Sequence, residues 1–202
     1  MPRGRRRFSL QLTVASLGLS VLLGVTCGGG HELSRLPTLD GRAPIVVAHR
    51  GASGYLPEET LEAYVKAIEL GADVVEMDLI STKDGVLICR HDPNLAISTD
   101  VASHPEFASR RKSTQVDGET QTGWFASDFT LAEIKTLGAI ATDVERPQQY
   151  NGRFRIVTFQ EVIDLVKART TTTGRRTRCT PRPRTPPTIA TLACPWRTPS
   201  LR

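Results

Sequence analysis

A short alternation of strand-like and helix-like segments between Pro44 and Pro93 constrains this chain most. The predicted elements are a strand, a glycine-containing turn, an amphipathic helix, a second strand, a tight turn and a third strand, at residues 45–48, 51–54, 60–70, 72–80, 83–85 and 86–90. Apolar side chains recur in the helix at three- and four-residue spacing, and Gly71 ends that pattern. This order of elements is typical of an α/β fold.

The stretch from about residue 94 to residue 155 has a different character. It is polar and rich in turn residues, and no strand–helix rhythm returns before Thr130. We interpret it as an insertion after the third strand. Helical periodicity resumes at 157–166, where Thr158 and Glu161 have the spacing of a capping box.

The charge of the whole chain misrepresents its central part. The 202 residues carry a formal net charge of +5, but four arginines lie in the first seven residues and eight more follow Lys167. Without these twelve, 14 basic residues stand against 21 acidic ones, so the central part has a net charge of about −7. Nucleic-acid binding needs a basic face on the folded domain, so no nucleic-acid partner is predicted.

Residues 1–27 resemble an export signal, and residues 28–43 are interpreted as a linker. A basic start precedes an apolar run at 10–25 that is too short and too interrupted to predict a membrane span. Residues 5–10 resemble a twin-arginine motif. Cys27 precedes a glycine run, as in a bacterial lipoprotein cleavage site; the alternative is a plain signal peptide ending near it. We therefore expect an exported protein, either periplasmic or attached to a membrane through lipidated Cys27.

Two acidic residues interrupt the second predicted strand. Glu76 and Asp78 are two residues apart, so their side chains project from the same face of an otherwise apolar strand. Two carboxylates on such a face are costly without a positive partner. A divalent cation such as Mg²⁺ or Ca²⁺ would satisfy them. The alternatives are salt bridges to nearby basic side chains, or exposure of one carboxylate at the strand end.

Basic side chains follow the first and third predicted strands. If these strands are parallel, His49 and His91 converge at one edge of the sheet. Imidazole titrates near neutral pH, which suits a general base and a general acid. Arg50 offers a planar fork for a phosphate. Structural hydrogen bonds for the histidines and a salt bridge for Arg50 are the alternatives.

Several short motifs follow one another along the chain. The core motifs are His49-Arg50-Gly51, Leu56-Pro57-Glu58-Glu59-Thr60, Glu76-Met77-Asp78 and His91-Asp92-Pro93-Asn94-Leu95. The insertion motifs are Asp117-Gly118-Glu119-Thr120, Gly123-Trp124-Phe125 and Asp128-Phe129-Thr130-Leu131. Together they resemble the glycerophosphodiester phosphodiesterase family, particularly its secreted bacterial branch. The resemblance covers residues 45–167 and is specific because the motifs follow one another in the family's order.

The resemblance implies a TIM (β/α)₈ barrel of the phospholipase C-like phosphodiesterase type, with the active site at the carboxyl ends of the strands. His49 and His91 would be the acid and base, and Arg50 would bind phosphate. Glu76, Asp78 and Glu58 would be ligands of a Ca²⁺ or Mg²⁺ cofactor. The implied reaction is hydrolysis of glycerophosphodiesters, such as glycerophosphocholine or glycerophosphoethanolamine, to glycerol 3-phosphate and an alcohol.

The chain departs from the family pattern at two positions. Glu59 replaces the usual Asn or His, and Ile97 stands where an Arg is common. We expect both to lie outside the central group of site residues and to alter, at most, the substrate preference. A phospholipase D-like enzyme on the same barrel, or a non-catalytic surface lipoprotein, remains an alternative function.

The end of the chain does not continue a barrel. A complete barrel takes about 250 residues, more than the 202 of this chain. Residues 168–202 are rich in Thr, Arg and Pro and contain no acidic residue. We expect this tail to be disordered and the barrel incomplete. The family's next strand supplies a third metal carboxylate in a Pro-Glu-x-Lys pattern, which the tail lacks. A shifted reading frame can encode this glutamate across Pro181 and Arg182, so we expect a frameshift and an inactive, truncated copy; a genuine basic tail is the alternative.

Overall fold

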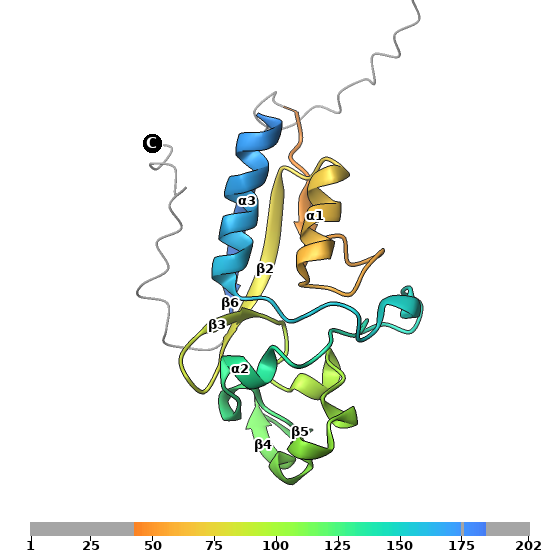
Figure 1. The fold of residues 1–202 in the computed structure, drawn as a ribbon, viewed down its shortest axis with the longest axis vertical. Coiled ribbons are helices and arrows are strands. Elements are labelled where there is room, and N and C mark those ends of the chain that lie inside the picture. The colour runs from red at the N-terminus through yellow and green to blue at the C-terminus, as the bar shows by residue number, and fades with distance from the viewer. Residues whose placement is uncertain (1–42, 175, 185–202) are drawn as a thin grey trace, which may run out of the picture. The chain divides into compact units, whose positions relative to one another are not determined.

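The computed structural model describes residues 43–174 and 176–184, and all of its elements lie in the compact unit that begins at Pro44 (Figure 1). The strands are β1 (Val47–His49), β2 (Val74–Ser81), β3 (Leu87–Cys89), β4 (Lys112–Val116), β5 (Glu119–Gly123) and β6 (Arg178–Pro183). The α-helices are α1 (Leu61–Glu69), α2 (Leu131–Ile134) and α3 (Phe159–Thr173). Short 3₁₀ helices are η1 (Leu95–Ile97), η2 (Val101–Ser103), η3 (Pro105–Arg110), η4 (Ala126–Asp128) and η5 (Gln148–Tyr150).

Among the described residues, three of the four strands in the main sheet are parallel. β1 pairs with Val74–Glu76 of β2, and β6 pairs with Val74–Leu79 of the same strand. α1 connects β1 to β2, α3 precedes β6, and α1 contacts both β2 and α3 (Figure 1). Parallel strands joined through helices are the repeating unit of a (β/α)₈ barrel. The described residues therefore form an α/β fold that is an incomplete TIM barrel, as predicted.

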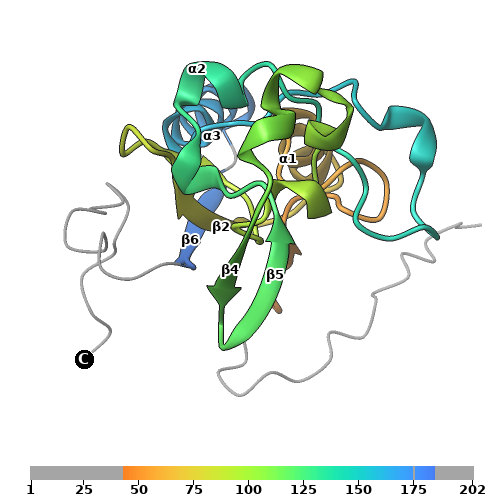
Figure 2. The same cartoon turned by 90° about the horizontal axis from the view of Figure 1, so that it is seen from below.

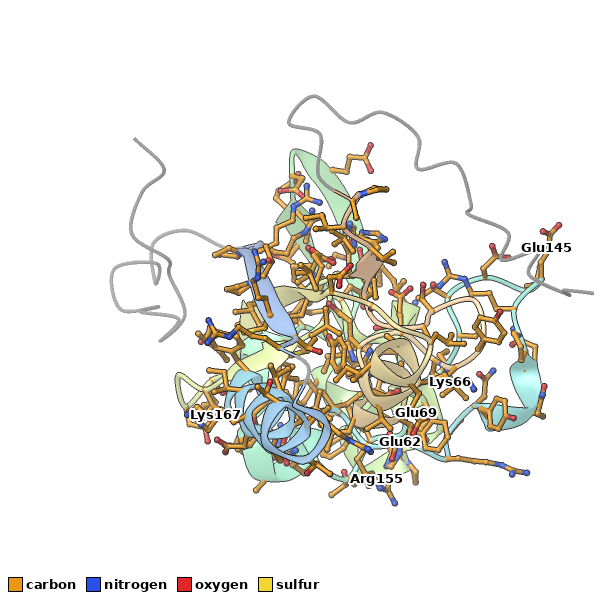
Figure 3. All side chains as sticks on the ribbon, turned by 90° about the horizontal axis from the view of Figure 1, so that it is seen from above. Glu62, Lys66, Glu69, Glu145, Arg155 and Lys167 are labelled. Carbon is orange, nitrogen blue, oxygen red and sulfur yellow. The ribbon has the colours of Figure 1, made fainter. Side chains whose placement is uncertain are left out.

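Both crossover helices begin at side-chain caps. The Thr60 hydroxyl accepts the N–H of Ala63 at 3.2 Å, and α1 buries an apolar face that includes Tyr64. Thr158 and Glu161 form the predicted capping box of α3. The opposite side of α1 is polar, and Figure 3 labels three of its residues, Glu62, Lys66 and Glu69.

The buried apolar side chains fall into two clusters. One cluster packs α1 and α3 against β2 and includes Tyr64, Met77 and Val162. The other lies under the inserted region and includes Phe107 and Phe129, whose rings meet edge to face with centroids 5.1 Å apart. The inserted region therefore has a core of its own that supports the connection between β3 and α3.

The third strand runs in the direction opposite to that expected of a parallel sheet. β3 pairs antiparallel with Leu79–Ser81 at the end of β2. The turn between them closes locally, because the Thr82 hydroxyl donates to Asp84 at 2.6 Å and accepts the N–H of Val86 at 2.9 Å. A hairpin this short cannot make a parallel crossover. The first and third predicted strands are therefore not parallel, so the condition under which His49 and His91 were expected to converge is not met.

The expectation of disorder from residue 168 onward was also wrong for the part of the tail that the structure describes. α3 continues to Thr173 and ends at Gly174, which has a φ of 66°. β6 then joins the sheet: the N–H groups of Arg178 and Arg184 donate to carbonyls at the two ends of β2. Pro181 and Pro183 alternate with these donors, so their missing N–H groups fall on the edge away from β2. Residues 185–202 lie outside the described residues.

The inserted region contains the β4–β5 hairpin, α2 and five 3₁₀ helices. Figure 2 shows the hairpin extending away from α2. The export signal, the linker and Cys27 fall in residues 1–42, which are outside the described residues. Among the helices that the structure does describe, none has the length and apolar character that crossing a bilayer requires.

Candidate active site

A tight turn at the end of β1 places His49 and Arg50. Arg50 has a φ of 59°, and its N–H donates to the Glu76 carbonyl at 3.1 Å and to Glu76 Oε2 at 3.2 Å. Gly51 has a φ of 81°, and a Cβ there would come within 2.9 Å of the Ala63 backbone. Glycine is therefore required for the turn to pack on α1.

The two acidic residues of β2 share a side of the strand, as its alternation predicted, and His49 joins them from the end of β1. His49, Glu76 and Asp78 each offer a ligand atom, and these atoms all lie within 4.8 Å of one another. Glu76 is 9% exposed and Asp78 is fully buried. Both carboxylate oxygens of Asp78 are buried and accept no hydrogen bond from the described residues, although Arg50 Nε lies 3.2 Å from Oδ2. A buried acceptor pair of this kind fits a hard divalent cation.

Arg50 and Glu58 complete what we call the strand-end cluster: His49, Arg50, Glu58, Glu76 and Asp78. Arg50 Nη1 lies 3.0 Å from Glu58 Oε1, and its Nε lies 3.2 Å from Asp78 Oδ2. Burial alone would lower the pKa of Arg50, but Glu58 and Asp78 outweigh this effect and raise it. In this structure Glu58 is thus paired with arginine and stands outside the His49–Glu76–Asp78 group.

The inserted region contributes to the same cluster, which the sequence did not predict. Arg146 Nη1 lies 2.8 Å from Glu58 Oε2, and the Thr142 hydroxyl donates to that oxygen at 3.1 Å. Burial would raise the pKa of Glu58, but Arg50 and Arg146 lower it below its usual value. Thr142 and Arg146 belong to a polar loop without a motif, so no signal in the sequence marks them.

His91 reaches the sheet through the β2–β3 hairpin. The N–H of Arg90 donates to the Asp78 carbonyl at 3.0 Å, so the chain returns beside Asp78 just before His91. His91 Nδ1 lies 3.2 Å from Asp92 Oδ1, and the His91 carbonyl accepts from Arg184 Nε at 3.3 Å. The hairpin, and not a pair of parallel strands, therefore brings the histidine to this part of the sheet.

Glu59 lies next to Asp78, against the expectation that this departure from the family pattern is remote. Glu59 Oε1 accepts the N–H of Asp78 at 2.6 Å, and the Glu59 side chain is fully buried. Burial raises the pKa of Glu59 to about 8, although Arg90 opposes this shift. Arg90 is fully buried as well, and burial lowers the pKa of its guanidinium.

β6 brings a basic residue to the acidic side chains of β2. Arg182 is the register partner of Asp78, and its Nε lies 4.0 Å from Asp78 Oδ1. The Arg182 side chain is 60% exposed. Within the described residues, β6 contains no carboxylate, so Arg182 stands beside Asp78 where the resemblance implies a third acidic ligand nearby.

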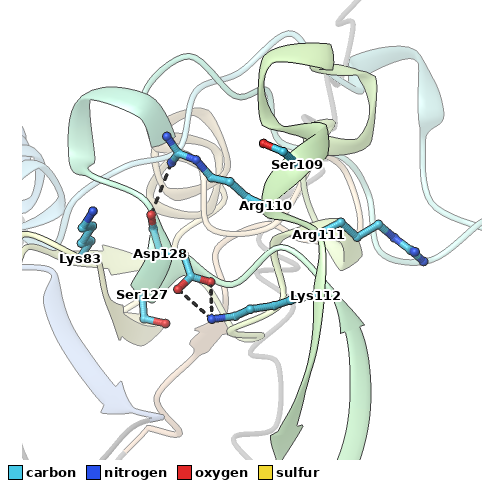
Figure 4. Close-up of a pocket in the computed structure, with 7 residues that line it drawn as sticks. All are labelled: Lys83, Ser109, Arg110, Arg111, Lys112, Ser127 and Asp128. Atoms are coloured by element: carbon cyan, nitrogen blue, oxygen red, sulfur yellow. Dashed lines mark hydrogen bonds and ion pairs between the residues drawn. The ribbon is translucent and has the colours of Figure 1, made fainter.

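A hollow apart from the strand-end cluster, which we call the basic pocket, has a volume of about 380 Å³ (Figure 4). Its lining residues are Lys83, Ser109, Arg110, Arg111, Lys112, Ser127 and Asp128. Lys112 Nζ lies 2.8 Å from the Asp128 carboxylate, and Arg110 Nη2 lies 2.5 Å from Glu133 Oε1. The pocket therefore neutralises much of its own charge.

Comparison with known proteins finds relatives of this chain in one family. Residues 49–180 match the glycerophosphoryl diester phosphodiesterase family. A glycerophosphodiester phosphodiesterase of Arabidopsis thaliana is 57% identical over 153 residues, which are 71% of this chain and 41% of that protein. One of Haemophilus influenzae is 35% identical over 178 residues, covering 82% of this chain and 46% of that protein.

A solved protein of Silicibacter pomeroyi assigned to the glycerophosphoryl diester phosphodiesterases has the same fold. It superimposes with a TM-score of 0.52 at 23% identity, over 70% of this chain and 45% of that protein. The chain thus spans less than half the length of each of these three relatives. The family match extends over well more than half of the 202 residues. This chain is a member of the glycerophosphoryl diester phosphodiesterase family.

Proposed function

We propose that the strand-end cluster serves metal-dependent hydrolysis of glycerophosphodiesters, such as glycerophosphocholine or glycerophosphoethanolamine, to glycerol 3-phosphate and an alcohol. The observation that carries this proposal is the approach of ligand atoms from His49, Glu76 and Asp78 to within 4.8 Å of one another. The adjoining Arg50 and the relatives named as glycerophosphodiester phosphodiesterases support it.

The acidic residues of the cluster would hold a Ca²⁺ or Mg²⁺ ion. Glu76 and Asp78 offer buried carboxylates, and Glu58 would join them by exchanging its arginine partners for the ion. When bound, such an ion polarises phosphoryl oxygens and lowers the pKa of an adjacent hydroxyl or water. Arg50 would bind the phosphate through its guanidinium fork.

His49 and His91 would move the protons of the reaction. One imidazole would take the proton of the nucleophile, and the other would donate a proton to the leaving alcohol as its bond to phosphorus breaks. Attack by water would give glycerol 3-phosphate directly, whereas attack by the glycerol 2-hydroxyl would give a cyclic phosphate that water then opens to glycerol 3-phosphate. Asp92 supports the His91 role, because its carboxylate lies 3.2 Å from Nδ1 and orients the ring. The Nε2 atom of His91 is then the one available for proton transfer.

Export is a further part of the proposal. The basic and apolar residues at 1–27 would direct the protein out of the cytoplasm, and a lipid on Cys27 would attach it to a membrane. Mass spectrometry of the mature N-terminus checks this: cleavage before an acylated Cys27 supports anchoring. Retention of the uncleaved first 27 residues contradicts export.

The activity is tested by release of glycerol 3-phosphate from glycerophosphocholine, with and without a chelator. The 202-residue chain and a version with the shifted frame restored are compared, and activity is expected of the restored protein only. In the restored protein, His49→Ala and His91→Ala should each lower kcat by about 100-fold or more. His104→Ala is the matched control, because His104 pairs with Glu106 in the inserted region. Turnover unaffected by the chelator or by both site variants would reject the proposal.

A further inference from the structure

Two ionisable side chains lie buried beside the strand-end cluster, and the proposed reaction uses neither of them. Glu59 and Arg90 are both fully buried. Glu59 belongs to the loop before α1, whereas Arg90 follows β3. Because burying a single charge is costly, such groups persist only where opposite charge and hydrogen bonds compensate. The attraction between Glu59 and Arg90 supplies part of that compensation.

The polar contacts of this pair go to residues that would bind the cation. Glu59 Oε1 accepts the N–H of Asp78 at 2.6 Å. Arg90 Nη1 donates to the Glu58 carbonyl at 2.7 Å, and the Arg90 N–H donates to the Asp78 carbonyl at 3.0 Å. Both backbone polar groups of Asp78 and the carbonyl of Glu58 are thereby fixed.

The backbone around Glu59 is held in an uncommon conformation. Glu59 has a φ of 57° and Arg50 a φ of 59°, both in the left-handed region that disfavours residues other than glycine. The two are joined directly, because the N–H of Glu59 donates to the Arg50 carbonyl at 3.0 Å. Local strain of this kind persists where surrounding contacts over-determine it, and it gathers at functional sites.

We propose that Glu59 and Arg90 are positioning residues that hold Asp78 and Glu58 in place for the cation. The inference rests on the proposed function of the strand-end cluster as a metal centre. Partners behind metal ligands orient those ligands, and their loss lowers metal affinity. Glu59 is therefore a part of the site, and its role is distinct from that of a substrate-contacting residue.

Amide hydrogen exchange of Asp78 in metal-free protein tests the contact without any ligand. The double variant Glu59→Leu with Arg90→Met replaces both ionisable side chains by apolar groups of similar volume, a change that proteins often tolerate. The Asp78 amide should exchange about tenfold faster in it. Glu59→Gln, which keeps an acceptor, should stay within about threefold of the wild type. Glu62→Gln on the exposed side of α1 is the matched control and should change nothing. Wild-type exchange at Asp78 in the double variant would overturn the proposal.

Calorimetric titration with Ca²⁺ and with Mg²⁺ tests the consequence for the cation. The double variant should bind about 10- to 100-fold more weakly than the wild type while still unfolding cooperatively. Unchanged affinity in a cooperatively folded double variant would contradict a positioning role and leave only a structural one. If the wild type binds neither ion, the metal-centre proposal fails, and the exchange result still decides whether Glu59 fixes Asp78.

Discussion

The strand-end cluster and the basic pocket both pair acidic with basic side chains, but the cluster buries its carboxylates whereas the pocket leaves its own partly exposed. In the cluster, Asp78 is fully buried and its Oδ2 lies 3.2 Å from Arg50 Nε. In the pocket, Lys112 and Asp128 have side chains that are 48% and 30% exposed, and they contact each other at 2.8 Å. Water and a local partner screen the charges of the pocket, whereas the buried carboxylates Asp78 and Glu58 of the cluster depend on arginine partners. The contrast separates carboxylates withdrawn from water from a surface ion pair that water reaches.

Removing the buried carboxylate gives the largest expected effect. Asp78→Asn keeps the shape of the side chain but removes the charge, so affinity for Ca²⁺ and Mg²⁺ should fall by about 100-fold or more. Calorimetric titration measures the change. Asp128→Asn in the basic pocket is the matched control and should leave the affinity unaltered. Equal losses of cation affinity in the two variants would show that the strand-end cluster is no more specific for the cation than the basic pocket.

Reversing the charge beside Asp78 should raise the affinity of the strand-end cluster for a divalent cation. Arg182 Nε lies 4.0 Å from Asp78 Oδ1, so Arg182→Glu replaces a repelling charge with an attracting one. The exposure of Arg182 screens the effect, and we expect divalent-cation affinity to rise by about tenfold. Arg178→Glu makes the same change on the same strand opposite Val74 and should have little effect. Weaker binding by Arg182→Glu would show that this end of β6 does not face the ion.

The ion pair of the basic pocket should contribute little to stability. A double-mutant cycle with Lys112→Met and Asp128→Asn, followed by urea unfolding, measures the coupling between the two side chains. We expect about 0.2–1 kcal/mol, because both groups are exposed. A coupling energy well above this range would mean that Lys112 and Asp128 interact as strongly as a buried ion pair in the strand-end cluster.

The smallest effect is a pH dependence at the margin of the pocket. The hydrogen bond from Arg110 and those from Thr130 lower the pKa of Glu133 to about 2, from its usual 4.5. A depressed pKa stabilises the fold above pH 4.5 and loses that contribution as the pH falls toward 2. The difference in free energy of unfolding between wild type and Glu133→Gln should therefore be constant above about pH 5 and shrink below it. A difference that grows on acidification has the wrong sign for this account.

The elements that local sequence determines were predictable. The apolar spacing in 60–70 and the Thr158–Glu161 capping box predicted α1 and the start of α3, because both signals act within one or two turns. The alternation in β2 likewise predicted that Glu76 and Asp78 share a side, and the structure gathers them with His49.

Features that depend on distant partners were not predictable. β6 has a composition that disfavours strands, and it forms because the carbonyls of Asp73 and Leu79 accept its N–H groups. The direction of β3 follows from the hydrogen bonds of the Thr82 turn. The position of Glu59 beside Asp78 depends on a hydrogen bond between residues that are 19 positions apart in the sequence. A sequence does not reveal such a contact until the fold is known.

The central claim is that the carboxylates of Glu76 and Asp78, beside His49, hold one divalent cation. Anomalous diffraction from crystals grown with Mn²⁺ tests it most directly. The account predicts a peak about 2.0–2.6 Å from carboxylate oxygens of both Glu76 and Asp78. A map whose manganese peaks all lie elsewhere, such as beside Asp128 in the basic pocket, would contradict it.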